Sequence, residues 1–276
     1  MPKTLSIITI NYNNANGLLK TIESVLIQNF KNFEYIIIDG ASTDDSVTTI
    51  KQYENSIDYW VSEPDKGIYN AMNKGLKKAS GDYVLFMNSG DLLYNKNVLQ
   101  RVFNAILPKD ELLYGDVLLK HELNNWERIQ EHPQKPPFSY FLKETICQQA
   151  CFIKRQLFDD IFYFNESYKI CADWEFLIYA IYIKKVNFKK LDTIVAIYDM
   201  EGVSSTAAYR DIAKKEREQT IDKYFPLFKD DYNTLMGYSS YRFKQLKAIE
   251  RSVVLRKLVS VIFKCFLFVL PKKRSK

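Results

Sequence analysis

Polar side chains follow three apolar runs in the first third of the chain. Asn11 and Asp39 come directly after runs rich in isoleucine, and Asp91 follows a third run through the turn Asn88-Ser89-Gly90. In an open α/β sheet, ligands bind beyond the carboxyl ends of the strands, so we expect these side chains to face one another. Carboxylate and amide oxygens are ligands that Mg²⁺ or Mn²⁺ accepts beside a diphosphate. The sequence therefore predicts a crevice suited to a nucleotide and a metal ion.

Each of these acids also has an interpretation that needs no ligand. A buried carboxylate needs donors. For Asp39 the donor could be the imide N–H of uracil, or the amides around Ala41 and Ser42, which would make it the cap of the next turn. Asp91 could hold a cation that stabilises charge on a leaving phosphate, or belong to an ordinary Asn-Ser-Gly-Asp turn. Their shared position at strand ends favours the ligand-binding interpretation.

Asp173 and Glu175 flank Trp174 at the start of a helix predicted over residues 173–183. A carboxylate at a helix N-terminus is stabilised as the anion, so it can be a cap or a proton acceptor. We expect one carboxylate to cap the helix and the other to point into the crevice. Trp174 would then form an aromatic wall for a sugar ring.

The elements that must position these residues follow from the apolar periodicity and the turn residues. The polar, proline-containing stretch 121–137 predicts a loop or lid. We expect a mixed, mainly parallel, Rossmann-like sheet flanked by helices. Its strands are predicted at residues 5–10, 34–38, 57–62, 83–87, 112–118, 149–154 and 186–198, and a helix is predicted near 97–107.

The chain of 276 residues carries a formal net charge of +6 that is unevenly distributed. Residues 247–276 hold nine Lys and Arg against one acid, whereas residues 1–246 hold 30 Lys and Arg against 32 acids. Because the body shows no basic patch of the kind that tracks a phosphate backbone, we expect no nucleic-acid partner. A charged stretch near 205–215 predicts a boundary between a domain of residues 1–210 and a helical C-terminal extension of residues 211–276.

The segment 253–270 is apolar but contains Arg256, Lys257 and Lys264. A transmembrane helix normally needs about 20 residues with few charges. On a helical wheel the three basic side chains gather on one side, and further basic residues follow at 272–274. This pattern predicts a helix lying on the anionic inner membrane surface. The alternative is a helix packed on the protein or on a second subunit.

The cysteine pattern favours a reducing compartment. The four cysteines show no CxxC pair, and no cleavable signal segment precedes the first predicted strand. Cys147 and Cys151 are better explained as small buried hydrophobes than as metal ligands. With the basic tail, these features predict a cytoplasmic protein attached peripherally to the membrane.

Several motifs, in order, resemble glycosyltransferase family 2, whose members have the GT-A fold. The resemblance covers residues 4 to about 205. It rests on Asn11-Tyr12-Asn13, on the runs 38–44 and 63–75, and on Gly81-Asp82-Tyr83. The later runs 148–153 and 168–175 look like the subgroup that builds bacterial exopolysaccharides and O-antigens, including colanic-acid-type enzymes.

The resemblance implies roles for individual residues. Asp39 would bind uracil, and Asp91 would hold Mn²⁺ or Mg²⁺. Asp173 would be the catalytic base that removes the acceptor hydroxyl proton while that oxygen attacks the anomeric carbon opposite UDP, with inversion. The implied nucleotide-sugar site consists of Ile10, Asn11, Tyr12, Asp39, Asp65, Lys66 and Asn88, with Tyr12 and the backbone near Ile10 around the base and Asp65 and Lys66 near the ribose and diphosphate.

Two departures from the family pattern affect the site. The usual Asp-x-Asp-Asp of the metal strand is here Asn88-Ser89-Gly90-Asp91, so only the last acid remains. One carboxylate with phosphate oxygens and waters is still a normal way to hold Mg²⁺. The second departure is that Asp173 follows Ala172, where many members have Glu-Asp.

The sequence thus predicts an inverting, metal-dependent hexosyl- or N-acetylhexosaminyltransferase. It would move a sugar from a UDP-sugar to a lipid-linked oligosaccharide or other glycan acceptor in surface polysaccharide synthesis. The depleted metal motif leaves open a non-catalytic nucleotide-sugar or glycan-binding subunit of an assembly complex. A nucleotidyltransferase would need a basic, Gly-rich loop after the first strand, and residues 11–17 contain no Lys or Arg.

Overall fold

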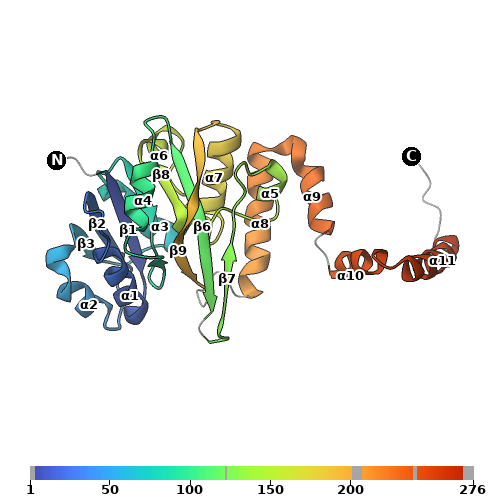
Figure 1. The fold of residues 1–276 in the computed structure, drawn as a ribbon, viewed down its shortest axis with the longest axis horizontal. Helices are drawn as coiled ribbons and strands as arrows, with labels where there is room; N and C mark the ends of the chain where they lie inside the picture. Colours follow the sequence, from blue (N-terminus) through green and yellow to red (C-terminus); the bar gives the residue numbers. More distant parts are fainter. Residues whose placement is uncertain (1–3, 122, 201–206, 239–240, 270–276) are drawn as a thin grey trace. The chain divides into compact units, whose positions relative to one another are not determined.

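The computed structural model describes residues 4–121, 123–200, 207–238 and 241–269. The chain divides into two compact units, residues 1–224 and 225–276 (Figure 1).

One mixed sheet forms the centre of the first unit. In the described residues it contains β1 (Leu5–Asn11), β2 (Phe33–Asp39), β3 (Tyr59–Ser62), β4 (Tyr83–Phe86), β5 (Leu92–Leu93), β6 (Leu112–His121), β7 (Trp126–Gln130), β8 (Cys151–Lys154) and β9 (Phe188–Asp199). The order is β3-β2-β1-β4-β8-β6-β9-β5, with β7 beside β6. Strands β3, β2, β1 and β4 are parallel, whereas β8 is antiparallel to β4 and β6. The predicted fold class is confirmed.

Helices flank this sheet and continue into the second unit. Those of the first unit are α1 (Ala15–Leu26), α2 (Ser46–Gln52), α3 (Ile68–Lys78), α4 (Val98–Ala105), α5 (Phe138–Phe141), α6 (Gln156–Asp160), α7 (Ala172–Tyr182) and α8 (Ala207–Tyr224). Those of the second unit are α9 (Lys229–Tyr238), α10 (Tyr241–Glu250) and α11 (Val253–Val269). Short 3₁₀ turns are η1 (Glu54–Ser56), η2 (Gln148–Ala150) and η4 (Pro226–Phe228).

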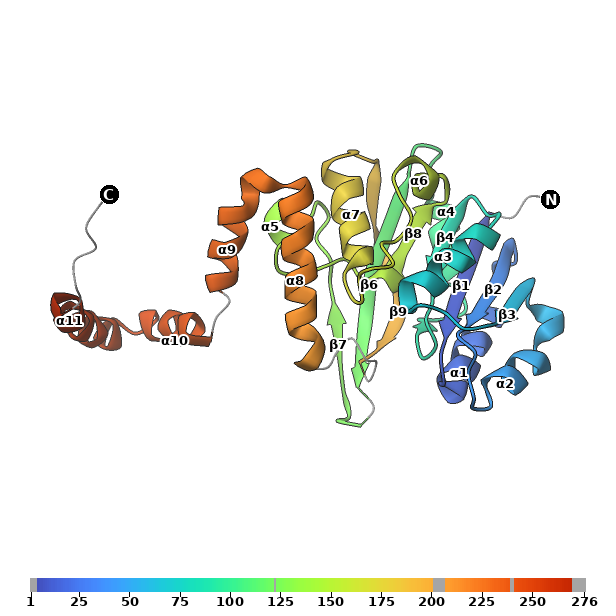
Figure 2. The same ribbon diagram turned by 180° about the vertical axis from the view of Figure 1, so that it is seen from behind.

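The two faces of the sheet are covered by different helices because side chains alternate along each strand. Leu5 and Ile7 of β1 belong to a buried cluster that includes apolar residues of α1 and α4. On the other face, a Cβ at Gly75 of α3 would lie 2.5 Å from Cγ2 of Ile8, so glycine allows α3 its close approach to the sheet. Figure 1 shows α1 and α4 in front of the sheet, and Figure 2 shows α3 and α7 on the opposite side.

The stretch predicted as a loop or lid contains a strand. Residues Trp126–Gln130 form β7, which pairs antiparallel with the end of β6 from Val117 to His121. Four of the five β7 side chains are exposed. A strand with little apolar alternation carries no periodic signal, which explains why the prediction was wrong here.

The helix α8 belongs to the first unit, so the division of the chain lies after Tyr224 and not near residue 210. Its Glu216 is buried, and its carboxylate accepts hydrogen bonds from the amides of Lys169 (2.6 Å), Ile170 (3.0 Å) and Cys171 (2.9 Å). The sequence of α8 is highly charged, which suggested a boundary before it. A sequence does not show which of several acids is buried and anchors the helix, as Glu216 does here.

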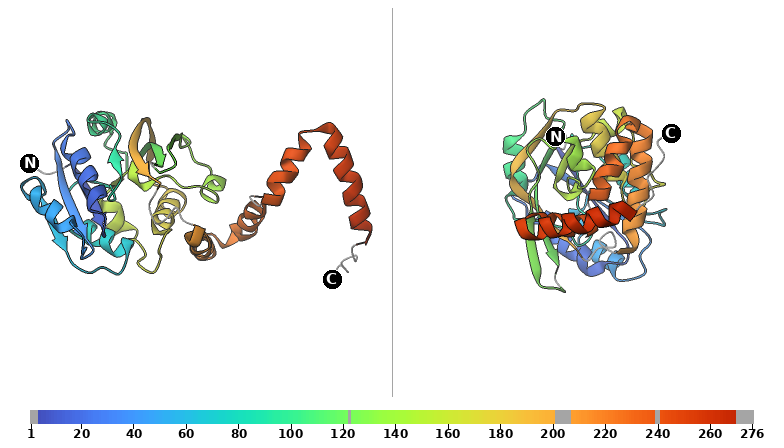
Figure 3. Two further views of the ribbon diagram at one scale, coloured as in Figure 1. Left: turned by 90° about the horizontal axis from the view of Figure 1, so that it is seen from below. Right: turned by 90° about the vertical axis from the view of Figure 1, so that its right-hand side faces the viewer.

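The second unit contains the predicted tail helix as α11. Arg251 and Ser252 separate α10 from α11, and the chain bends between these helices (Figure 3). The hydroxyl of Ser252 accepts a hydrogen bond from the amide of Leu255 at 3.3 Å. No helix in the described ranges has both the length and the apolar character needed to cross a membrane. Residue 270 and the basic residues 272–274 lie outside the described residues.

Candidate active site

Asp39 ends β2 with its carboxylate fully saturated by donors. It is completely buried, and it pairs in register with Asn11 of β1. Its Oδ1 accepts from Nδ2 of Asn11 (2.7 Å) and Oγ of Ser42 (2.6 Å), and its Oδ2 accepts from the amide of Ser42 (2.9 Å) and Oγ of Ser62 (2.6 Å). The cap of the following turn, predicted as the alternative role, is therefore present. A uracil N–H can reach Asp39 only where one of the two hydroxyls turns away.

Tyr12 and Asp65 approach each other over Gly40, immediately after Asp39. A Cβ at Gly40 would lie 2.5 Å from Oδ2 of Asp65 and 3.2 Å from Cδ2 of Tyr12. A side chain at position 40 would therefore have to displace the carboxylate of Asp65. The Tyr12 ring is 68% exposed and offers a face on which a base can stack. Lys66 is exposed beside Asp65, and its amide donates to Oδ1 of Asn70 at 3.1 Å.

The turn 88–91 is tied to β1 and α1 by hydroxyl groups. Oγ of Ser89 donates to Oδ1 of Asn11 (2.7 Å), and the amide of Ser89 donates to the carbonyl of Ile10 (3.1 Å). Oγ1 of Thr21 donates to the carbonyl of Asp91 (2.9 Å) and accepts from the amide of Gly90 (3.0 Å). Asn11 thus connects Asp39 on one side to this turn on the other, so the predicted strand-end residues do meet.

Asp91 and Asn88 carry buried oxygens that lack hydrogen-bond partners. Asp91 is 4% exposed, and burial raises the pKa of its carboxyl to about 7, with the nearby Asp199 carboxylate adding to the rise and Gln149 opposing it. Within the described residues, Oδ2 of Asp91 and Oδ1 of Asn88 accept no hydrogen bond. Unsatisfied buried oxygens are costly. A divalent cation would satisfy both, so these two residues fit the metal that the family resemblance implies.

The two acids that flank Trp174 face different surroundings. Oδ1 of Asp173 accepts a hydrogen bond from the hydroxyl of Tyr69 at 2.8 Å. Burial raises the pKa of Asp173, and the Tyr69 hydrogen bond opposes that rise. Glu175 lies 3.7 Å from Nζ of Lys223 on α8. Asp173 is therefore the one of the pair that faces α3, and no side chain caps α7 at Cys171.

The prediction that Trp174 forms an aromatic wall for a sugar ring is wrong. Trp174 is 1% exposed, and its Nε1 donates to the carbonyl of Phe141 at 2.8 Å. Arg217 of α8 lies over its ring, 5.3 Å from the ring centroid. The indole is a core residue because α5 and α8 cover it, and sequence spacing cannot reveal that coverage.

Two asparagines of α3 hold the segment that precedes α7, and no role for them was predicted from the sequence. Asn73 exchanges hydrogen bonds with the backbone of Phe164 (2.8 and 3.0 Å), and Asn70 and Asn73 both donate to Glu166 (2.8 and 2.9 Å). These contacts hold the segment that leads into α7 against α3. Polar side chains on the inward face of an amphipathic helix are the signal that could have found them.

Cys147, in the segment after α5, is influenced by both the candidate metal ligand and the candidate base. Burial raises the pKa of the Cys147 thiol to about 12, and the charges of Asp173 and Asp91 add to that rise. The Cys147 thiol thus lies within electrostatic range of both carboxylates. Asp91 belongs to the turn between β4 and β5, and Asp173 belongs to the first turn of α7.

A neutral histidine, His132, holds the segment that begins at Cys147. Nε2 of His132 accepts from the amide of Cys147 (3.3 Å), so its proton resides on Nδ1, which lies 2.9 Å from the Tyr140 hydroxyl. Burial lowers the pKa of His132 to about 4, against the pull of Asp116. The imidazole therefore stays uncharged at neutral pH and anchors the start of the Cys147 segment.

Comparison with known proteins identifies the family to which the chain is similar. The family described as Glycosyl transferase family 2 matches residues 6–162. A PGL/p-HBAD biosynthesis glycosyltransferase of Mycobacterium bovis is 29% identical over 76% of this chain and 82% of its own. An uncharacterized glycosyltransferase of Mycobacterium tuberculosis is 33% identical over 73% and 77%.

Solved structures share the fold. TarS 1-349 of S. aureus, in complex with UDP-GlcNAc, has a TM-score of 0.64 at 20% identity, covering 84% of this chain and 70% of its own. The mannosyltransferase PcManGT of Pyrobaculum calidifontis, with GDP-Man and Mn²⁺, has a TM-score of 0.63 at 15% identity, covering 97% and 83%. The fold is thus GT-A, and the class is that of the glycosyltransferases. The chain belongs to glycosyltransferase family 2.

Proposed function

We propose that this glycosyltransferase moves a sugar from a UDP-sugar to a lipid-linked glycan acceptor, with inversion and with a divalent cation. The observation that carries the proposal is the pair of buried oxygens, Oδ2 of Asp91 and Oδ1 of Asn88, that accept no hydrogen bond within the described residues, because a cation there could hold the diphosphate end of the donor while Asp173 acts as a base. TarS in complex with UDP-GlcNAc supports a uridine donor. PcManGT with GDP-Man and Mn²⁺ supports the cation.

Asp173 is the group that acts on the acceptor. A general base must be ionised and within hydrogen-bond reach of the proton that it removes. Tyr69 donates to Oδ1, which favours the anion that would receive the acceptor proton. Attack by that acceptor oxygen on the anomeric carbon, on the side opposite UDP, inverts the configuration.

The donor is held along the strand ends. Tyr12 would stack on the base, Asp39 would accept its imide N–H, and Asp65 and Lys66 would lie beside the ribose and diphosphate. Asn88 and Asp91 would hold Mn²⁺ or Mg²⁺. When bound, the cation supplies positive charge that stabilises the leaving diphosphate.

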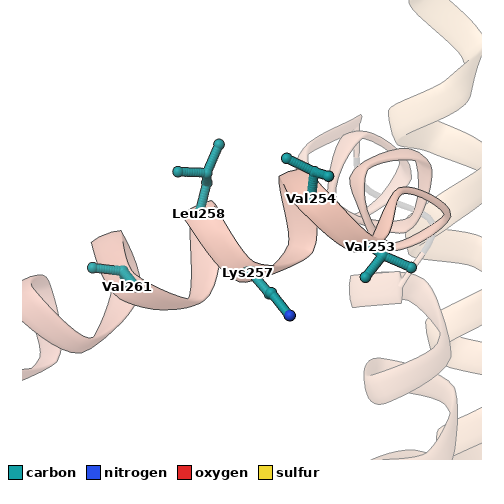
Figure 4. Close-up of a pocket in the computed structure, with 5 residues that line it drawn as sticks. All are labelled: Val253, Val254, Lys257, Leu258 and Val261. Carbon is teal, nitrogen blue, oxygen red and sulfur yellow. The ribbon is translucent and has the colours of Figure 1, made fainter.

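The tail supports a membrane-bound acceptor. A shallow hollow on the surface of α11 is lined by Val253, Val254, Lys257, Leu258 and Val261. Figure 4 shows Val254 and Leu258 on one side of the helix and Lys257 on the other. Exposed apolar side chains beside basic ones suit a helix in the interface of an anionic membrane. These features support our proposal that the protein acts at the cytoplasmic face of the membrane, in exopolysaccharide or O-antigen synthesis.

The first experiment is UDP release by the purified full chain from a panel of UDP-sugars. Each donor is tested with and without Mn²⁺ and with a short polyprenyl-diphosphate sugar. We expect acceptor-stimulated, metal-dependent release with one donor, and anomeric analysis of the product to show inversion. UDP binding without release from any donor would instead favour a binding subunit.

Membrane attachment has its own test, which is co-sedimentation with vesicles. We expect binding to vesicles that contain anionic lipid and not to neutral ones, with loss of binding at high salt. The matched variant replaces Arg256, Lys257 and Lys264 with Gln. Equal sedimentation of this variant and the unmodified chain would contradict the proposed role of the tail.

A further inference from the structure

We propose that Asp199, the last residue of β9, supplies the second carboxylate of the divalent-cation site, in place of the acid that the turn lacks at Gly90. This inference rests on the proposed metal-dependent transfer. It assigns the site a residue from a part of the chain more than a hundred positions away from the turn.

Strand pairing brings the two segments together. The short strand β5 follows Asp91 directly and pairs antiparallel with β9, with Leu92 opposite Ile197 and Leu93 opposite Ala196. Continued by two positions, this register sets Gly90 opposite Asp199. The amide of Asp199 donates to Oδ1 of Asp91 at 3.4 Å, so the two acids are direct neighbours.

The glycine of the turn leaves the space that Asp199 uses. Gly90 has a φ of +105°, a conformation that L residues rarely adopt. A Cβ at Gly90 would lie 3.2 Å from Oδ2 of Asp199 and 3.6 Å from its Cβ. An acid at position 90 would therefore be strained and would set its charge against Asp199. The carboxylate that the family places in the turn is provided here by the neighbouring strand.

Unsatisfied oxygens point to a cation between these groups. Asp91 is only 4% exposed. Within the described residues, Oδ2 of Asp91 accepts no hydrogen bond, and neither does Oδ1 of Asn88. Mg²⁺ and Mn²⁺ accept carboxylate and amide oxygens together with phosphate oxygens and water.

The protein ligands are too few for a tight site without the donor. In the part of the chain that the structure describes, no group of three or more His, Cys, Asp or Glu side chains could hold a metal alone. Asp91, Asp199 and Asn88 would therefore need the diphosphate oxygens to complete the shell. It follows that Mn²⁺ should bind much more tightly when UDP is present.

The test is Mn²⁺ affinity, measured by the electron paramagnetic resonance signal of free Mn²⁺ in titrations of the full chain with and without UDP. We expect Asp199→Asn to weaken Mn²⁺ binding in the presence of UDP by about tenfold or more. Asp91→Asn should weaken it at least as much. The matched control is Asp192→Asn, an exposed position on the same strand, which should bind as the unmodified chain does.

Three outcomes separate this inference from the proposed function. Mn²⁺ binding by Asp199→Asn that equals the control, while Asp91→Asn is impaired, would overturn the role of Asp199 and leave the proposed function standing. Absence of UDP-dependent Mn²⁺ binding in the unmodified chain would overturn both. If Asp199→Asn does not fold, Asp199→Glu, which moves the carboxylate by one methylene, must change the Mn²⁺ affinity for the inference to survive.

Discussion

The proposed donor site has a base end around Asp39, where the nucleobase would bind, and a reaction end around Asp91. The two ends differ in how they satisfy a buried carboxylate. At the base end, Asp39 is fully buried and accepts four hydrogen bonds from neighbouring strands and the next turn. At the reaction end, Asp91 is nearly as buried, yet one of its oxygens has no hydrogen-bond partner within the described residues. A buried charge is stable only when it is paired or hydrogen-bonded. The hydrogen bonds at the base end therefore favour a contribution of Asp39 to folding stability, whereas the reaction end is, in our proposal, completed by ligands.

The largest effect that this comparison predicts is on transfer by Asp173→Asn. We expect the rate of sugar transfer to fall by about 10²–10⁴-fold, because the general base that removes the acceptor proton is lost. Stability should change little, because the amide oxygen still accepts from Tyr69. UDP release measures the first and urea unfolding the second. Glu175→Gln is the matched control, since that acid faces α8; equal losses in both variants would contradict the assignment.

Asp39→Asn should give the largest loss of stability. Its amide NH₂ would face hydroxyl and amide donors, which leaves about two hydrogen bonds unmade at about 1–3 kcal/mol each. We therefore expect the free energy of unfolding in urea to fall by about 3 kcal/mol. The exposed Asp45→Asn serves as control. A loss below about 1 kcal/mol would mean that the base end is not prearranged as described.

The buried, neutral His132 should make the free energy of unfolding depend on pH. Its pKa is about 4 in the folded chain and about 6.5 when unfolded, so the unfolded state binds the proton first. The stability that neutral His132 contributes is complete above pH 6.5 and is lost as pH falls toward 4, by up to about 3 kcal/mol. Urea unfolding of the unmodified chain and of His132→Gln between pH 7 and pH 4 measures the difference. Parallel curves would show that His132 does not titrate as expected.

Tyr69→Phe should alter the pH profile more than the maximal rate. Without the hydroxyl, the ionised form of Asp173 loses a hydrogen bond and its pKa rises. The acid limb of the rate profile should therefore move to higher pH, with a loss of less than about tenfold on the alkaline side. Tyr163→Phe removes a comparable hydrogen bond, 2.8 Å to Asp159 at the surface, and should leave the limb in place.

Asp91→Asn should have the smallest effect on stability, in contrast to Asp39→Asn. The substitution removes a buried charge that lacks a full set of donors, so we expect unfolding in urea to change by less than about 1 kcal/mol, or stability to increase. Metal-dependent transfer should fall in the same variant. A loss of stability equal to that of Asp39→Asn would erase the contrast between the two ends.

The sequence by itself determined the parallel half of the sheet and the position of its polar ends. Buried parallel strands are continuous apolar runs, and their turns follow local residue preferences, so β1, β2 and β4 could be predicted closely. Register then placed Asn11 beside Asp39. These features depend on short segments and their immediate neighbours, which a sequence displays directly.

Tertiary structure alone decided which polar groups are satisfied and what lies beside them. The exposed strand β7, the burial of Trp174 under α8, the anchoring of the helix by Glu216 and the approach of Asp199 to Asp91 all depend on segments far apart in the chain. An aspartate looks the same in a sequence whether its carboxylate oxygens accept four hydrogen bonds or none. Its role depends on the donors that packing brings to it, and those become visible only when the strands and helices have taken their places.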